Sequence, residues 1–221
     1  MNLIAHRGHK NNNIKENTIE AFDMAYKLGY KGLECDVRVT KDKKLVICHD
    51  AFINRVSNGN GLIKNKTYKE LLKYNFGTKE KPSKIPLLKT ILKRYNFIKI
   101  IELKEDIDIK QIEKYIDENT IFISFNKYRI EKLKKEYPKY KYGVLNYVFN
   151  SDSIYNLDII CVLEDVMTKN IENYFINKGI KVFIYGINKN IKYVSKNKDI
   201  YYIIDNMWYD ENGEVYGLRI T

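Results

Sequence analysis

Two carboxylates stand one residue apart in Glu34-Cys35-Asp36, inside the apolar run Gly32–Arg38 that predicts a strand. Side chains alternate along a strand, so Glu34 and Asp36 point to one face and Cys35 to the other. Burying both carboxylates without compensation would cost several kcal/mol for each. A hard divalent cation such as Mg²⁺ or Ca²⁺ prefers oxygen ligands and would compensate them. A solvated strand edge is the structural alternative.

A third carboxylate, Glu102, lies in the apolar run Ile98–Leu103, and Lys104 follows two residues later. The same alternation places both side chains on one face, at the C-terminal end of the predicted strand. There Glu102 can complete a metal site, and Lys104 can supply a fixed positive charge for a phosphate oxygen. An exposed surface ion pair, which contributes little to stability, is the alternative.

The chain has three histidines, and two of them follow predicted strands. His6 comes after Leu3–Ala5, and His49 comes after Lys44–Cys48. Two imidazoles whose pKa values lie near neutrality can act as general acid and general base on a phosphodiester. His9 lies in a polar loop, and we expect it to have a structural role.

Arg7 directly follows His6, and its guanidinium suits either a phosphate or an ion pair within the fold. Further on, Asn17 and Glu20 have the spacing of a helix capping box, which would explain both structurally. Because this helix would begin just after the first strand, Glu16 or Asn17 can also face the site.

Short apolar runs alternate with amphipathic runs along the chain. The expected strands are Leu3–Ala5, Gly32–Arg38, Lys44–Cys48, Ile98–Leu103, Thr120–Ser124, Lys141–Leu145, Asp158–Leu163, Lys181–Tyr185 and Tyr201–Ile204. The expected helices are Thr18–Leu28, Leu87–Tyr95, Ile109–Asn119, Lys127–Glu136, Thr168–Lys178 and Asn190–Lys196. This alternation predicts an α/β fold, a (β/α)8 TIM barrel, with an open doubly wound sheet as the alternative.

Residues 51 to about 85 break this alternation, with a Gly- and Asn-rich stretch and a short helical run near Tyr68–Tyr74. They predict a short insertion after the second strand that shapes the substrate pocket. The 221 residues, 44% of them hydrophobic, suit a single domain over residues 1–221.

The net charge of +11 comes almost entirely from lysines spread along the chain, which favours a solvated coat over a nucleic-acid site. No apolar run approaches the 18 residues or so of a membrane span, and the N-terminus lacks a signal-peptide pattern. We therefore expect a cytoplasmic protein without stable membrane insertion. The scattered Cys35, Cys48 and Cys161 predict buried, reduced thiols.

Taken together, these residues resemble the glycerophosphodiester phosphodiesterase family over roughly the first half of the chain. The matching motifs, in order, are His6-Arg7-Gly8, Glu16-Asn17-Thr18 with Ala21-Phe22, Gly29, Gly32-Leu33-Glu34-Cys35-Asp36-Val37, Thr40-Lys41-Asp42, Val46, His49-Asp50, Arg55 and Ile101-Glu102-Leu103-Lys104. Each motif is weak alone, but the ordered set is specific.

The resemblance implies a TIM barrel whose metal ligands are Glu34, Asp36 and Glu102, whose catalytic pair is His6 and His49, and whose phosphate contacts are Arg7 and Lys104. It implies one divalent cation, Mg²⁺ or Ca²⁺, and supporting positions at Glu16, Asn17 and Asp50. The implied reaction releases glycerol 3-phosphate and an alcohol from a small glycerophosphodiester. In this family the glycerol hydroxyl of the substrate attacks first, and water then opens the cyclic phosphate.

Two other functions remain open on the sequence. A phospholipase D-like activity on intact phospholipids would use a similar barrel and site, with exposed apolar loops. A non-catalytic binding protein would use the same fold after loss of site residues, whereas every motif residue is present in this chain.

Overall fold

The computed structural model describes residues 1–147, 157–187 and 191–206. The chain divides into two compact units, which we describe separately. The N-terminal unit comprises Ala5–Thr120, and the C-terminal unit comprises Met1–Ile4 together with Ile121–Thr221. Every candidate site residue lies in the N-terminal unit.

Strands β2 (Gly32–Val39) and β4 (Ile98–Leu103) form the centre of the N-terminal unit and run parallel. Their apolar side chains are buried on both faces, which is typical of a parallel sheet covered by helices. The short strand β3 (Leu45–Ile47) pairs antiparallel with β2. Strand β1 (Asn2–His6) ends in this unit at His6.

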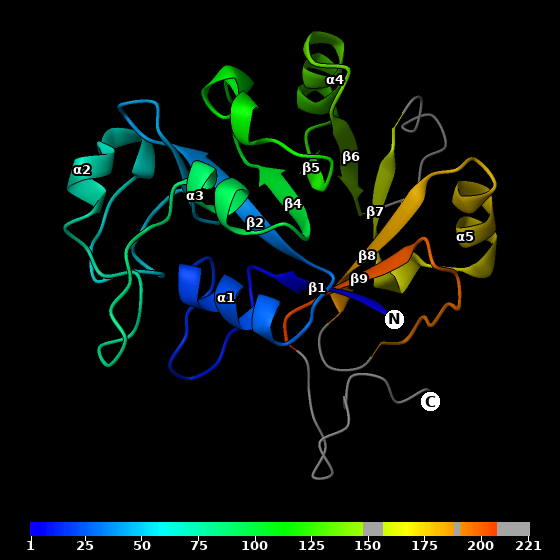
Figure 1. Cartoon of the computed structure of the whole chain (residues 1–221), viewed down its shortest axis with the longest axis horizontal. Coiled ribbons are helices and arrows are strands. Elements are labelled where there is room, and N and C mark those ends of the chain that lie inside the picture. Colours follow the sequence, from blue (N-terminus) through cyan, green and yellow to red (C-terminus); the bar gives the residue numbers. More distant parts are fainter. Residues whose placement is uncertain (148–156, 188–190, 207–221) are drawn as a thin grey trace. The chain divides into compact units, whose positions relative to one another are not determined.

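Two helices of this unit follow strands in the expected order (Figure 1). Helix α1 (Ile19–Lys27) buries Ala21, Phe22 and Ala25, and α3 (Leu88–Arg94) buries three aliphatic side chains. Both helices lie within the ranges that the sequence predicted.

The insertion after β2 and β3 is a folded lobe with its own apolar cluster, drawn in cyan beside α2 in Figure 1. It contains a 3-10 turn at Ile63–Asn65 and helix α2 (Tyr68–Leu71), which begins with a complete capping box between Thr67 and Glu70. The buried members of the cluster are Val46, Cys48, Ile53, Val56, Ile63, Leu71, Phe76 and Ile85. The lobe is therefore anchored to β3 by a shared core and can present side chains at fixed positions.

The C-terminal unit is a run of parallel strands with helices between some of them. Its strands are β5 (Thr120–Ser124), β6 (Lys141–Asn146), β7 (Ile159–Leu163), β8 (Lys181–Ile187) and β9 (Ile200–Ile204), each paired with the next. Its helices are α4 (Lys127–Glu136) and α5 (Lys169–Ile176), with a 3-10 turn at Glu164–Val166. Each strand that the sequence predicted is present, and no bound differs from the expected one by more than two residues.

The helix expected over Ile109–Asn119 is wrong, because this segment forms two 3-10 turns, Ile109–Gln111 and Glu113–Tyr115. The amides of Ile112 and Tyr115 donate to carbonyls three residues earlier, at 2.9 and 2.8 Å, and Asp117 accepts from the amide of Asn119, which a helix would use, at 3.1 Å. Asp108 caps the first turn by accepting from the amide of Lys110 at 3.0 Å. Asp and Asn compete with helices in this way.

The helix expected over Asn190–Lys196 is also wrong for residues 191–196, while Asn190 lies outside the described residues. Buried Glu164 accepts hydrogen bonds from the amides of Lys192 at 2.7 Å and Tyr193 at 3.3 Å. Tyr202 accepts from the amide of Ser195 at 2.8 Å. Glu164 lies 28 residues from Lys192 along the chain, so the local pattern could not predict this partner.

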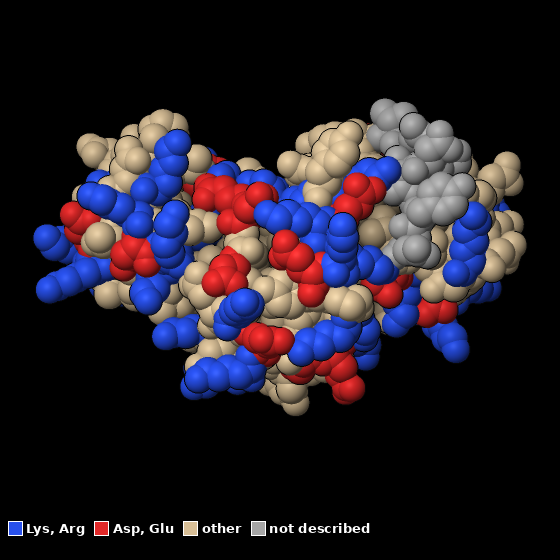
Figure 2. All heavy atoms as spheres, turned by 90° about the horizontal axis from the view of Figure 1, so that it is seen from above, with Lys and Arg blue, Asp and Glu red and all other residues tan. Residues whose placement is uncertain are grey.

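Lysine and arginine side chains alternate with Asp and Glu over the face drawn in Figure 2 and do not merge into one basic patch. Among the described residues, no helix has both the length and the apolar character needed to cross a membrane.

All three cysteines are buried and none of them forms a disulfide, as the sequence predicted. Burial raises the pKa of the Cys48 thiol to about 12, so that it stays protonated near neutral pH.

Candidate active site

The three candidate metal ligands converge at the end of the parallel pair β2–β4. The register places Asp36 directly opposite Glu102, and Glu34 shares a face of β2 with Asp36. One carboxylate oxygen from each residue lies within 4.8 Å of the others. Glu34 is 3% exposed, Asp36 is 0% exposed and Glu102 is 8% exposed, so the three carboxyl groups are almost completely shielded from solvent.

The pKa values of this cluster reflect its burial and mutual repulsion. Burial, followed by repulsion from Asp36 and Glu102, raises the pKa of Glu34 well above its usual range. Burial and repulsion from Asp36 raise the pKa of Glu102 as well. Burial also acts to raise the pKa of Asp36, but attraction to Lys104 and Arg7 outweighs it and lowers that pKa.

Two cationic side chains hold Asp36 in place. The Lys104 ammonium lies 3.0 Å from Asp36 Oδ1 and 2.5 Å from Glu102 Oε1. Arg7 Nε lies 3.2 Å from Asp36 Oδ2. Burial opposes the charged form of Lys104, yet the two carboxylates raise its pKa. Two positive charges thus face three carboxylates, which leaves the cluster one negative charge in excess when all are ionised.

The turn after β1 has an unusual backbone that brings Arg7 to this cluster. Arg7 has φ 58°, in the left-handed region that non-glycine residues seldom adopt. In this conformation its amide donates to the carbonyl of Glu34 at 3.0 Å and lies 3.1 Å from Glu34 Oε2. Such strain persists where the surrounding contacts over-determine it, as at functional sites.

Gly8 follows in the same turn with φ +81°, and a Cβ there would lie 2.7 Å from the backbone of Ala21. The amide of His9 donates to the Ala21 carbonyl at 2.9 Å. The turn therefore packs directly on helix α1, and only glycine fits this close approach.

Asn17 contacts the carboxylate cluster and is not the helix cap that the sequence suggested. The cap of α1 is Thr18, whose hydroxyl accepts from the Ala21 amide at 3.3 Å. Asn17 has φ 56° and donates its side-chain N–H to Asp36 Oδ2 at 2.9 Å. Glu20, the other half of the expected capping box, instead accepts from the hydroxyl of Ser83 at 2.8 Å.

His49 lies at the end of β3 with one ring nitrogen fixed. Its Nδ1 lies 2.7 Å from Asp50 Oδ1, and burial lowers the pKa of the imidazole. Arg38 donates from Nε and Nη2 to the His49 carbonyl at 3.0 and 2.8 Å. Sequence reasoning missed Arg38, although the strand alternation places it on the same face as Asp36 and could have found it.

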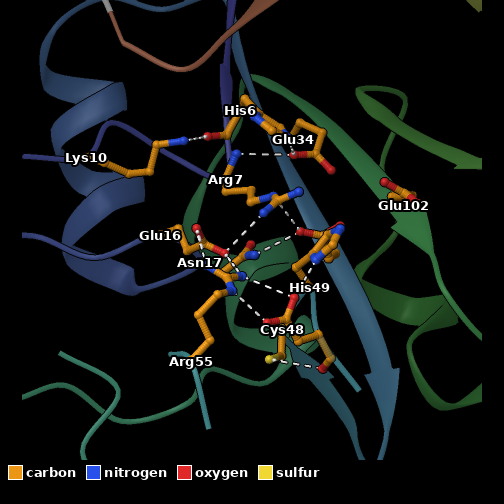
Figure 3. Close-up of polar contacts among 12 residues, drawn as sticks. His6, Arg7, Lys10, Glu16, Asn17, Glu34, Cys48, His49, Arg55 and Glu102 are labelled. Atoms are coloured by element: carbon orange, nitrogen blue, oxygen red, sulfur yellow. Dashed lines mark hydrogen bonds and ion pairs between the residues drawn. The ribbon is translucent and has the colours of Figure 1, made fainter. Parts of the chain in front are cut away.

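His6 lies at the end of β1, with Nε2 3.9 Å from Glu34 Oε2 and its carbonyl bound by the Lys10 ammonium at 3.1 Å (Figure 3). Its side chain is 34% exposed, as is that of His49, so both rings border the cluster and remain accessible. His9 contacts the Tyr30 hydroxyl through Nδ1 at 3.1 Å, in keeping with the structural role expected for it.

Arg55 joins the two remaining supporting candidates, Glu16 and Asp50, although the sequence predicted no role of its own for it. Arg55, from the insertion, donates to both carboxylates (Figure 3). Glu16 also accepts from Arg7 Nη1 at 3.1 Å. The structure thus brings every predicted site residue into one connected network of the N-terminal unit.

The carboxylate cluster fits a hard divalent cation. Its donors are all oxygens, which Mg²⁺ and Ca²⁺ prefer, and the repulsion among them is relieved by added positive charge. Asn17 Oδ1 is buried beside it and accepts no hydrogen bond from the described residues. Glu34, Asp36 and Glu102 are the residues that would hold such an ion.

Comparison with known sequences gives matches over much of the chain. Residues 6–158 match the model of the Glycerophosphoryl diester phosphodiesterase family. The chain is 38% identical over 160 residues to a glycerophosphodiester phosphodiesterase of Caldanaerobacter subterraneus subsp. tengcongensis, covering 65% of this chain and 65% of that protein. It is 34% identical over 160 residues to the putative glycerophosphodiester phosphodiesterase YhdW of Bacillus subtilis, covering 66% of this chain. The matches span 65% of the length of each of these two relatives.

Solved structures confirm the (β/α)8 barrel that the sequence predicted. A glycerophosphodiester phosphodiesterase from Agrobacterium tumefaciens has a TM-score of 0.77 and 21% identity, covering 93% of this chain and 97% of its own. A phosphodiesterase from Oleispira antarctica, solved in complex with the product sn-glycerol-3-phosphate, has a TM-score of 0.76 and 22% identity, covering 85% of each chain. At these identities the likeness concerns the fold.

The close approach of Gly8 to α1 generates a stability prediction. Gly8→Ala combines the strain of a left-handed alanine with a clash against Ala21, and it should lower the free energy of unfolding by about 2–5 kcal/mol in urea denaturation. Gly29→Ala is the matched control, since Gly29 has φ +78° with open space around its Cβ position. The control should lose only the backbone term, about 1–2 kcal/mol. Equal losses in the two variants would contradict the proposed packing of the turn on α1.

Proposed function

Because the chain belongs to the glycerophosphoryl diester phosphodiesterase family, as its motifs predicted, we propose that it hydrolyses a glycerophosphodiester to glycerol 3-phosphate and an alcohol. One observation carries the proposal: three buried carboxylates meet beside two cationic side chains, and the accessible rings of His6 and His49 lie at the ends of β1 and β3. The complex of the Oleispira antarctica protein with sn-glycerol-3-phosphate supports the same class of product. In this proposal, residues 1–221 act as one catalytic domain.

The proposed cofactor is one divalent cation, Mg²⁺ or Ca²⁺, held by Glu34, Asp36 and Glu102. When bound, such an ion supplies positive charge to a phosphoryl oxygen and stabilises the charge that develops there. Arg7 and Lys104 already face Asp36, and the same two groups are suited to bind the non-bridging phosphate oxygens. Together these charges select an anionic phosphodiester as the substrate.

His6 and His49 are the proposed general acid and general base. Burial lowers the pKa of His49, which favours the neutral ring that can accept a proton near pH 7. The contact between His49 Nδ1 and Asp50 leaves Nε2 as the nitrogen that exchanges a proton with substrate. One histidine takes the proton of the attacking glycerol hydroxyl, and the other protonates the leaving alcohol. Water then opens the resulting cyclic phosphate with the two roles reversed.

Turnover of model substrates tests the activity and its dependence on metal. The purified chain is incubated with glycerophosphocholine, glycerophosphoethanolamine and glycerophosphoglycerol, and glycerol 3-phosphate is measured. We expect release with Mg²⁺ or Ca²⁺ present and none after treatment with EDTA, since the carboxylates alone only repel the substrate. Phosphatidylcholine is included as an intact phospholipid, and its turnover is followed by the release of choline, because a phospholipase D-like reaction leaves the glycerol phosphate on the lipid. Turnover of that lipid alone would favour the phospholipase D-like activity, and turnover of no substrate would contradict both.

Histidine substitutions test the acid–base pair, with the third histidine as an internal control. His6→Ala and His49→Ala should each lower kcat by roughly 10²–10⁴ while leaving the circular dichroism spectrum unchanged. His9→Ala, which removes only the contact with Tyr30, should keep a rate close to that of the wild type. A rate near wild type in His6→Ala or His49→Ala would remove that residue from the proposed mechanism.

A further inference from the structure

Arg55 of the insertion lies between two carboxylates and binds both through two contacts each (Figure 3). Its Nε and Nη2 donate to the two carboxylate oxygens of Asp50 at 2.6 and 3.1 Å. Its Nη2 and Nη1 donate to the two oxygens of Glu16 at 2.7 and 3.1 Å. A planar guanidinium can hold two carboxylates in fixed orientations in this way, whereas an ammonium cannot.

The carboxylate that Arg55 holds on one side, that of Asp50, also contacts the ring of His49. Hydrogen bonds from Arg55 are the main reason that the pKa of Asp50 lies far below its usual range, so Asp50 stays ionised. Its Oδ1, which Arg55 also binds, lies 2.7 Å from His49 Nδ1. The partner of one imidazole nitrogen determines the tautomer and the orientation of the ring. Fixing the Asp50 carboxylate therefore fixes the ring of His49.

On its other side, Arg55 holds the carboxylate of Glu16, which in turn orients the guanidinium of Arg7. Glu16 Oε1 accepts from both Arg55 Nη2 and Arg7 Nη1, at 2.7 and 3.1 Å. Arg7 in turn contacts Asp36 in the carboxylate cluster. A continuous chain of contacts thus runs from the imidazole of His49 to the guanidinium of Arg7, with Arg55 at its centre.

Stability alone gives a weak reason for this arrangement. The side chain of Arg55 is 52% exposed, and exposed ion pairs contribute only about 0–1 kcal/mol to folding. The N-terminal unit contains a close match in Arg94, which is 49% exposed and binds both oxygens of Asp23 at 2.8 and 2.7 Å. The two sites differ in the second partner of the carboxylate. Asp23 accepts a hydrogen bond from the hydroxyl of Tyr95, whereas Asp50 contacts the imidazole of His49.

We propose that Arg55 is a positioning residue of the reaction, acting through Asp50 on His49 and through Glu16 on Arg7. The inference rests on the proposed phosphodiesterase function and adds a role for the insertion. The insertion supplies a guanidinium that links a proposed acid–base group to a proposed phosphate-binding group. The packed core of the lobe, which includes Ile53 and Val56 on either side of Arg55 in sequence, holds that guanidinium in place.

Kinetics of Arg55→Ala against Arg94→Ala tests this role, with glycerophosphocholine as substrate and saturating Mg²⁺ or Ca²⁺. Arg55→Ala should lower kcat roughly ten- to a hundredfold, the usual effect of losing a partner that orients a functional histidine. Arg94→Ala should keep a kcat close to wild type, while the two variants shift the melting temperature by similar amounts. Equal kcat values in the two variants would overturn the proposal.

A double-mutant cycle with Asp50→Asn separates positioning from general damage. If Arg55 acts through Asp50, the double variant should lose less activity than the product of the two single losses, because the second change removes an interaction already broken. Losses that multiply would overturn the proposal.

The variant Arg55→Lys tests the same role if the alanine variant fails to fold. It keeps the charge but cannot bind both carboxylates through paired contacts, so kcat should stay well below wild type, and full activity would overturn the role.

The wild-type rate in the same assay distinguishes the two levels of inference. Wild-type turnover with an unaffected Arg55→Ala variant removes the positioning role and leaves the proposed function standing. Absence of wild-type turnover overturns the proposed function and, with it, the role of Arg55.

Discussion

Repulsion among three buried carboxylates is the constraint on which the N-terminal unit depends. Parallel register puts Asp36 opposite Glu102, and strand alternation puts Glu34 on the same face, so the fold itself forces the three together. Several kcal/mol per group would be lost if they were ionised and uncompensated. Arg7 and Lys104 offset part of this repulsion through Asp36, whereas burial and the remaining repulsion raise the pKa values of Glu34 and Glu102. In the proposed function, a divalent cation and an anionic phosphodiester would together bring the charge of the ionised cluster, Arg7 and Lys104 to zero.

The surrounding structure is arranged to bring cationic and amide groups to Asp36. Arg7 and Asn17 both adopt left-handed backbone conformations, and the Asn17 amide donates to the Arg7 carbonyl at 2.9 Å. Gly8 lets this pair of turns pack on α1. Arg7 contacts Glu34, Glu16 and Asp36, and Asn17 contacts Arg7 and Asp36, and such contacts hold the strained residues at the cluster.

Much of this site follows from local sequence rules. Alternation in β2 predicts the shared face of Glu34 and Asp36, and the strand ends predict His6, His49 and Lys104. Local rules fail where a partner distant in the sequence binds the group in question. Glu164 takes the amides of an expected helix, and Asp36 takes the Asn17 side chain that resembled a helix cap. Arg55 belongs to the matching motifs, but the positioning role proposed for it does not follow from local rules, because Glu16 lies 39 residues away from it along the chain.

Glu34, Asp36 and Glu102 are proposed to form one site for a divalent cation. Isothermal titration of the purified chain with Mg²⁺ and Ca²⁺ tests it most directly, with Asp36→Asn and the exposed-residue control Glu80→Gln measured alongside. We expect one ion per chain in the wild type and in the control, and loss of binding in Asp36→Asn, because that change removes one of the three carboxylate ligands. Absence of binding at millimolar metal, or unchanged binding in Asp36→Asn, would contradict this assignment.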